Sequence, residues 1–180
     1  MSDGLYAGAC TIGRLSTVTE DQVRGLAELL IDCVEGGASV SFMHPLPIAK
    51  ALAFWRRVAD AVAVGERALL VAEDAGRVVG TVHLVLHQPD NQPHRADLAK
   101  MLVHRGARHQ GLGAALVRAA EDLARSCGKS LLVLDTVTGS DAERLYARLG
   151  WLRCGVIPGY ALLPRGGLCA TTYFYRVLGN

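Results

Sequence analysis

The sequence predicts a single α/β domain whose mixed, mostly antiparallel sheet carries helices on both faces. Two amphipathic helical patterns lie in the first third of the chain, and strand-like segments separated by turns follow them. One further segment near residue 130 is fully apolar, which is typical of a strand buried on both faces. Of the 180 residues, 51% are hydrophobic and 20% are charged, so one globular domain without extensive disorder is expected.

The amino-terminal segment is expected to hold a tail, a strand and a helix. Residues 1–8 are small and Gly-rich, so we expect a flexible amino terminus followed by one domain over residues 9–180. A first strand is expected over residues 10–15. Thr19 and Gln22 then have capping-box spacing, and the apolar residues behind them recur at helical spacing up to a Gly-Gly pair.

A loop separates this helix from a second one, which is expected over residues 48–64. The loop, residues 38–45, is apolar and rich in hydroxyl groups, and the neighbouring glycines and prolines oppose regular structure. Because it carries Phe42 and Met43, it must either bury them or offer them to a ligand. Two interpretations therefore stay open: a loop folded onto the core, and a loop that lines a substrate pocket.

Strands and helices alternate through the rest of the chain. A strand, a tight turn, a strand, a polar loop and a further strand are expected over residues 69–73, 74–77, 78–86, 87–93 and 95–103. A helix over 112–126, an apolar strand over 130–134 closed by Asp135, and a short helix over 142–149 follow. Two last strands, 151–157 and 171–177, are joined through Pro158-Gly159-Tyr160 and a Pro-Arg-Gly-Gly turn.

The most informative segment is the turn between a strand and a helix, where the chain reads Arg108-His109-Gln110-Gly111-Leu112-Gly113, with Ala114 behind it. Gly111 and Gly113 carry no side chains at this reversal, so backbone N–H groups can approach an anion near the positive helix end. Arg108 can add a cation to the same site. The third glycine of a Rossmann fingerprint and the Walker lysine are both missing, which disfavours those nucleotide sites.

The turn resembles the pyrophosphate loop of the GCN5-related N-acetyltransferases, whose pattern is Arg/Gln-x-x-Gly-x-Gly/Ala after a strand. Ala142, Tyr146 and then Leu149-Gly150-Trp151 resemble a second landmark of that family, Ala-x-x-x-Tyr followed by Gly-Phe/Trp. The order of the expected elements also matches this acyl-CoA N-acyltransferase fold over nearly the full chain. Gly139 departs from the asparagine that many members place against the cofactor, and Ser140 is a candidate substitute.

This resemblance implies an N-acetyltransferase that uses acetyl-CoA as a co-substrate. It also implies that the fourth and fifth strands splay apart, so that backbone groups of one strand can pair with pantetheine as a further strand would. The glycine turn would then hold the pyrophosphate. The cofactor-binding residues expected on this basis are Met101, Leu102, Val103, Arg108, His109, Gln110, Gly111, Leu112, Gly113, Ala114 and Ser140.

A narrower resemblance concerns one branch of the family. Residues 36–43, Leu134-Asp135-Thr136, Pro158-Gly159-Tyr160 and Tyr173-Phe174-Tyr175 look like segments of the tabtoxin resistance protein and its relatives. Those enzymes acetylate a small amino-acid-like β-lactam toxin, which implies a small amine acceptor here, of the antibiotic or toxin kind. Phe42, Met43 and Tyr160 are the expected substrate-binding residues. A shared branch does not by itself identify the substrate.

Acetyl transfer to an amine needs a base, because free amines are mostly protonated at neutral pH, and the departing thiolate needs a proton. The candidate bases are Asp97, four residues before Met101, and Asp135, directly after the apolar strand. They stand out because an acid in or next to an apolar strand is costly without a partner. We expect both to face one cleft between the splayed strands. An outward-facing strand residue and a strand-end cap are the alternatives. Tyr146 is the candidate acid by resemblance, and its ordinary pKa of about 10 leaves it protonated; a core tyrosine is the alternative.

Two alternative functions stay open. One is an enzyme that acetylates a protein N-terminus or lysine, and the other is a CoA-binding module without turnover.

Composition limits the partners of the protein. A net charge of +2 argues against a nucleic-acid surface. No apolar run reaches about 18 residues and no leader pattern is visible, so we expect a cytoplasmic monomer or homodimer without a membrane partner. The cysteines and histidines lack metal-ligand spacing, so no metal is expected. We expect His83 and His87 at a strand edge, as structural or solvated residues.

Overall fold

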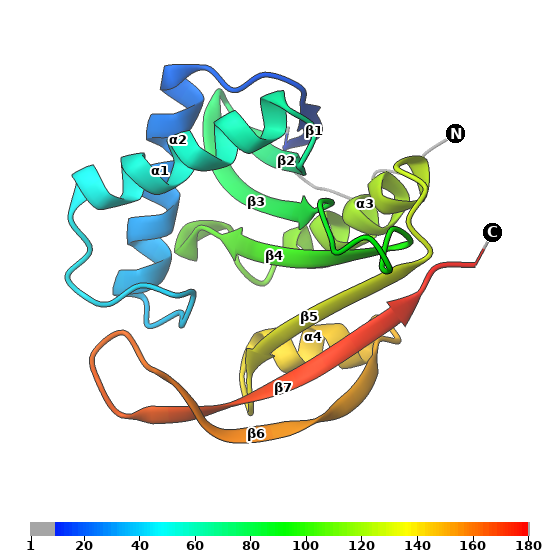
Figure 1. Ribbon diagram of the computed structural model, residues 1–180. Helices are drawn as coiled ribbons and strands as arrows, with labels where there is room; N and C mark the ends of the chain where they lie inside the picture. The colour runs from blue at the N-terminus through cyan, green and yellow to red at the C-terminus, as the bar shows by residue number, and fades with distance from the viewer. Residues whose placement is uncertain (1–9, 180) are drawn as a thin grey trace.

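The structure is a computed structural model that describes residues 10–179, so the flexible terminus expected over residues 1–8 lies outside the described residues. Within residues 10–179, seven strands form one sheet in the order β1-β2-β3-β4-β5-β7-β6, and only β4 and β5 pair in parallel (Figure 1). The elements are β1 (Thr11–Leu15), α1 (Glu20–Glu35), α2 (Ile48–Ala63), β2 (Arg67–Asp74), β3 (Arg77–Val85), β4 (Arg95–Val103), the 3-10 turn η1 (Arg105–Ala107), α3 (Leu112–Ser126), β5 (Leu131–Val137), α4 (Asp141–Arg148), β6 (Leu152–Leu162) and β7 (Leu168–Val177). The predicted α/β class with a mostly antiparallel sheet is confirmed.

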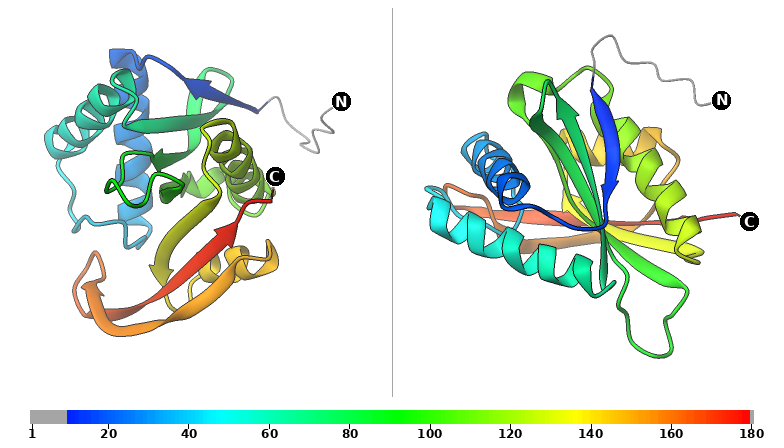
Figure 2. Two further views of the ribbon diagram at one scale, coloured as in Figure 1. Left: turned by 45° about the vertical axis from the view of Figure 1, so that its right-hand side comes forward. Right: turned by 90° about the horizontal axis from the view of Figure 1, so that it is seen from above.

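Helices cover both faces of the sheet, as expected. α1 and α2 pack on one face and α3 on the other, so that β2, β3 and β4 lie between them (Figure 2). Two apolar clusters fill these layers, and alternate residues of one strand serve both of them. Leu69 and Val71 of β2 join the cluster under α1 and α2, whereas Leu70 joins the cluster under α3. This double burial explains why β2 reads as a continuous apolar run.

Side-chain caps mark the beginnings of α1 and α4. The Thr19 hydroxyl accepts from the Gln22 N–H and the Gln22 side chain accepts from the Thr19 N–H, which confirms the predicted capping box of α1. α4 begins behind Ser140, whose hydroxyl accepts from the Glu143 N–H at 3.1 Å. α3 differs from both, because the residue before it is Gly111, which offers no side-chain cap.

β4 and β5 pair only where they begin. The parallel register joins residues 95–97 to residues 131–133, although β4 runs on to Val103 and β5 to Val137. Figure 1 shows β5, together with β7 and β6, diverging from β4 beyond this point. The expected splaying of the fourth and fifth strands is confirmed, and the second half of β4 has no strand paired on its β5 side within the described residues.

Several strand boundaries differ from those expected. β5 continues two residues past Asp135, so this acid lies inside the strand rather than closing it. β6 runs to Leu162 and β7 begins at Leu168, so Pro158-Gly159-Tyr160 lies within β6 instead of forming a connection. A register shift in the β6–β7 pairing absorbs these residues, and an edge strand tolerates proline because its outer side needs no donor.

His83 corrects the expectation of a strand edge. It lies in β3, which is paired on both sides, and only 1% of its surface is exposed. Its Nε2 lies 3.0 Å from Arg67 Nη1, and its ring meets Trp55 edge-on with the centroids 6.2 Å apart. Burial, together with the positive charges of Arg67 and Lys100, holds the pKa of His83 well below its ordinary value.

Acidification from pH 7.5 to 5.5 is therefore expected to destabilise the protein through His83. The buried imidazole stays neutral, whereas in the unfolded chain it gains a proton near pH 6.5. The contribution of His83 to the free energy of unfolding is therefore complete above that pH. Below it, this contribution falls by up to about 1.4 kcal/mol per pH unit. Urea unfolding at several pH values measures the slope in wild type and in His83→Gln, which should lose this part of it. His87→Gln, at an exposed site, is the control, and equal slopes in all three proteins would contradict the prediction.

Candidate active site

The turn before α3 adopts backbone conformations that favour glycine. Gly111 has a φ of 82°, in the left-handed region, and His109 has a φ of 61°. α3 begins directly behind this turn, without a side-chain cap and without an acidic residue in its first turn. Because the first N–H groups of a helix have no intrahelical acceptor, this end of α3 is a place that attracts anions.

A cavity of about 980 Å³ extends from this turn, past the facing ends of β4 and β5, to the loop 38–43 and the β6–β7 hairpin. It joins the anion-attracting helix end to a region lined by the loop and the hairpin, two segments that are far apart in the sequence. The predicted site residues that line it are Phe42, Met43, Met101, Leu102, Val103, Arg108, His109, Gly111, Leu112, Gly113, Ala114, Asp135, Ser140, Tyr146 and Tyr160.

Two predicted site residues do not line this cavity. The Gln110 side chain is exposed and donates to the Gly106 carbonyl at 3.4 Å. The Asp97 carboxylate accepts from Gln88 Nε2 at 3.1 Å and pairs with Arg95. The expectation that Asp97 and Asp135 face one cleft is therefore corrected, because Asp97 lies in the part of β4 that is still paired with β5.

Asp135 and Tyr146 meet the cavity from β5 and α4. Asp135 is exposed, and its carboxylate accepts from Thr171 Oγ1 at 2.9 Å. Tyr146 is only 4% exposed, and its ring packs against Trp151 and Phe174, with centroids 5.6 and 6.2 Å away. Burial, and then the negative charge of Asp135, raise the pKa of Tyr146. The tyrosine is therefore a protonated hydroxyl in electrostatic reach of an exposed carboxylate.

The predicted substrate-binding residues lie at the far end of the cavity. Phe42 is buried in the core under α1 and α2 and also lines the cavity, whereas Met43 is 42% exposed, so the loop both folds onto the core and lines the cavity. The hydroxyls of Tyr160 and Tyr173 are hydrogen-bonded at 2.8 Å. This bond, burial and the charge of Asp135 raise the pKa of Tyr173 to about 12.

The loop and the β6–β7 hairpin are tied to each other across this end. The Ser39 hydroxyl donates to the Leu162 carbonyl at 3.2 Å, and the His44 N–H donates to the Pro164 carbonyl at 2.8 Å. Two segments that are more than 100 residues apart in the chain thus form one continuous wall. The loop and the hairpin together line this end of the cavity.

Comparison with known proteins decides the family. The sequence model of the acetyltransferase (GNAT) family matches residues 24–151. The chain belongs to the GNAT family. An N-acetyltransferase from Azospirillum brasilense, described as uncharacterized and located in the hisH-hisA intergenic region, is 30% identical over 127 residues, covering 69% of this chain and 74% of the relative. The protein is thus an N-acetyltransferase of the GNAT type.

Solved GNAT structures share the fold. The Salmonella typhimurium protein yncA, solved with acetyl-CoA, has a TM-score of 0.77 and 22% identity, with 96% of both chains covered. The phosphinothricin acetyltransferase (Pat) of Sinorhizobium meliloti, in complex with acetyl-CoA, has a TM-score of 0.77 and 18% identity, covering 94% of this chain and 89% of that one. These similarities show that the fold is shared, and a shared fold does not identify the acceptor.

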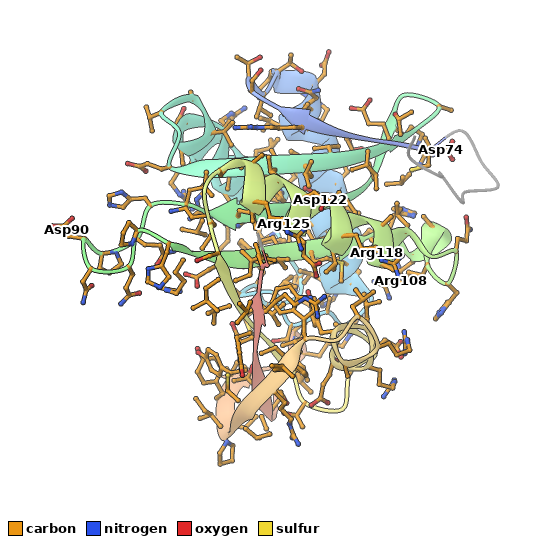
Figure 3. The ribbon with its side chains drawn as sticks, turned by 90° about the vertical axis from the view of Figure 1, so that its right-hand side faces the viewer. Asp74, Asp90, Arg108, Arg118, Asp122 and Arg125 are labelled. Atoms are coloured by element: carbon orange, nitrogen blue, oxygen red, sulfur yellow. The ribbon has the colours of Figure 1, made fainter. Side chains whose placement is uncertain are left out.

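The GNAT cavity is also lined by a cation, Arg118, that the sequence did not single out. Arg118 of α3 lines it together with Arg108, and Figure 3 shows these two near each other, with Asp122 and Arg125 further along the helix. Arg108 Nε donates to the Val103 carbonyl at 3.2 Å, which fixes the side chain beside the turn. The exposed Arg118 sits among inward-facing apolar residues, and no local pattern distinguishes it from a solvated helix residue.

Lys100 and Ser41 are two further cavity residues that the sequence analysis missed. Lys100 Nζ donates to Ser41 Oγ at 3.2 Å, and both residues have left-handed backbones, with φ of 50° and 74°. A lysine inside an apolar strand is unusual enough to indicate a special role. The direction of the Lys100 side chain, however, depends on a bulge in β4 that the sequence does not reveal.

The described residues contain no group of three or more histidine, cysteine, aspartate or glutamate side chains placed to hold a metal ion. Among them there is also no helix long and apolar enough to cross a membrane.

Proposed function

We propose that the protein transfers the acetyl group of acetyl-CoA to the amine of a small amino-acid-like molecule. The observation that supports this most directly is a cavity lined by the first residues of α3 and by Asp135 and Tyr146. We assign an anion site, a base and a proton donor to this cavity. These are the groups that acetyl transfer to an amine requires.

The residues around the turn fit a diphosphate such as that of CoA. The residue before α3 is a glycine, which leaves room for an anion at the helix end, and Arg108, Arg118 and His109 add positive or polar groups to the same end. Bound acetyl-CoA would supply the acetyl group as an activated thioester. The unpaired side of β4 near Met101 suits the amides of its pantetheine arm, while the Val103 carbonyl already accepts from Arg108.

Asp135 and Tyr146 take the two proton roles. Asp135 would accept a proton from the ammonium group of the acceptor, directly or through water, which leaves the nitrogen lone pair free to react. Thr171 holds the carboxylate by its hydrogen bond. Tyr146, whose raised pKa keeps it protonated, holds a proton for the leaving sulfur. Asp97 stays a second candidate base, although Arg95 and Gln88 occupy its oxygens.

We assign the acceptor to the end of the cavity that the loop 38–45 and the β6–β7 hairpin line, the acceptor end. The hydrogen bonds at Ser39 and His44 join the loop to the hairpin across this end, which favours a compact acceptor over an extended peptide. The resemblance to the tabtoxin resistance branch supports an antibiotic or toxin as the kind of acceptor. On this basis we assign small molecules ahead of protein N-termini and lysines.

The test is thiol release from acetyl-CoA across a panel of amines. The panel contains single amino acids, β-lactam amino acids, polyamines and short peptides with free N-termini. We expect acceptor-dependent release with amino acids and little with peptides. A preference for peptides would overturn the small-molecule assignment, and CoA binding without any acceptor-dependent release would support a module without turnover.

Gly111→Ala is expected to weaken acetyl-CoA binding roughly tenfold and to lower the free energy of unfolding by about 1 kcal/mol. Alanine disfavours the left-handed φ of 82°, so the start of α3 must shift. Gly128→Ala is the matched control: it has a φ of 73° at the other end of α3, outside the cavity, with no atom near an added Cβ. It should lose similar stability without losing acetyl-CoA affinity. Equal affinity of both variants, measured by calorimetric titration, would contradict the prediction.

A further inference from the structure

Lys100 occupies an unusual position in the sheet. β4 pairs regularly with β3 up to Ala99, and the register then shifts before Leu102, so Lys100 lies in a bulge with a φ of 50°. Left-handed backbone is unfavourable for lysine and bulges commonly re-aim a side chain. Here the bulge sends Lys100 into the acceptor end of the cavity, where it reaches Ser41.

Ser41 is held in a similar way. It is exposed on the cavity wall, and its φ of 74° is also in the left-handed region. Among the described residues, four non-glycine positions have positive φ, and His109, Ser41 and Lys100 are the three of them that line the cavity. Backbone strain of this kind is typical of ligand-binding positions. The bond between Lys100 and Ser41 joins two such positions.

The ammonium group of Lys100 has no carboxylate at ion-pair distance within residues 10–179. Its neighbours include the Ser41 hydroxyl and the Phe54 ring, 5.8 Å from Nζ to the centroid. Burial lowers the pKa of Lys100, Asp135 opposes that shift and Arg67 adds to it. A half-buried ammonium is costly unless an anion accompanies it.

We propose that Lys100 binds the carboxylate of the acceptor, so that the enzyme selects amino acids over amines of the same shape that lack this group. The inference rests on the proposed function. Asp135 and Lys100 line the same cavity as one negative and one positive group, which is the arrangement that complements an ammonium and a carboxylate in one small molecule. Ser41 orients the lysine and can donate a second hydrogen bond to the same carboxylate.

The experiment compares each L-amino acid with its α-carboxamide as acceptor. Wild type should prefer the acid by roughly 10- to 100-fold in kcat/KM, mostly through a lower KM. Lys100→Met removes the charge at similar length and should abolish the preference, whereas Lys100→Arg should retain part of it. Lys50→Met is the matched control, because Lys50 lies 6.0 Å from the Phe42 ring on the exposed side of α2, outside the cavity, and should keep the wild-type preference.

Each outcome supports or overturns the assignment. Thermal unfolding and acetyl-CoA titration of Lys100→Met and Lys100→Arg test whether both variants are folded and bind acetyl-CoA as wild type does. An unchanged ratio of acid to carboxamide in Lys100→Met overturns the role of Lys100 and leaves the proposed function standing, as does a wild-type preference for carboxamides. If neither acids nor carboxamides cause thiol release in wild type, the proposed function fails together with this inference.

Discussion

Replacing Asp135 with asparagine is expected to lower kcat/KM for the amine acceptor by roughly 100- to 1,000-fold at pH 7, because the variant keeps the shape of the side chain but loses the base. Asparagine can still accept the hydrogen bond that Thr171 donates at 2.9 Å, so the pairing of β5 with β7 should persist. Initial rates of thiol release at saturating acetyl-CoA, with the acceptor concentration varied, measure the effect. The loss should shrink as the pH rises toward the pKa of the acceptor amine, which then arrives deprotonated.

Asp97→Asn is the matched control for this prediction. It removes a carboxylate that Arg95 and Gln88 hold outside the cavity, and we expect a change of less than about tenfold. If Asp97→Asn lost as much activity as Asp135→Asn while remaining folded, the base would have to be reassigned to Asp97. A pH-independent defect in Asp135→Asn would likewise argue for a positioning role rather than proton transfer.

Tyr146→Phe is expected to reduce kcat roughly 100-fold with little change in KM for either substrate. The ring is buried against Trp151 and Phe174, so phenylalanine preserves the packing and removes only the hydroxyl. Since burial and Asp135 raise the pKa of Tyr146, the wild-type hydroxyl is a proton donor throughout the neutral range. Single-turnover measurement of thiol release isolates the chemical step from product release.

Tyr175→Phe provides the comparison for Tyr146→Phe. Tyr175 lies half-buried on β7, outside the cavity, and the substitution is chemically identical. The substitution should leave kcat within about twofold of wild type, because it removes a hydroxyl outside the cavity. Should Tyr146→Phe retain full kcat, the proton for the leaving sulfur must come from elsewhere, and Tyr146 would then be a core residue, the alternative weighed from the sequence.

The turn at Gly111 illustrates what local patterns can predict. A strand, a pair of glycines and an amphipathic helix follow one another within a few residues, so the left-handed backbone and the uncapped start of α3 depend on nearby sequence alone. The capping box of α1 was predictable for the same reason. The β6–β7 hairpin was less predictable, because a register shift lets proline and glycine stay inside an edge strand.

The acids of the site show where local patterns stop. Asp97 and Asp135 are both acids in largely apolar strands, and Arg95, two residues before Asp97, is a local difference that does not show which acid reaches the cavity. The register does: Asp97 is paired with Val133, before the strands part, whereas Asp135 lies two residues beyond that pair, where the gap has opened. Lys100 was missed because a bulge in β4, set by pairing with β3, decides where its side chain points.

By itself, the sequence determined the kinds and order of the elements, the helix beginnings and the anion-attracting turn, since these follow from φ preferences, periodicity and capping within a few residues. The tertiary structure alone decided which side chains share the cavity. The divergence of β5 from β4 and the bulge in β4 place Asp135 and Lys100 on the lining of one cavity, which Tyr146 of α4 also lines. Which side chains line one cavity depends on contacts between distant segments, because a shift of one residue in strand register turns the side chains of that strand to the opposite face.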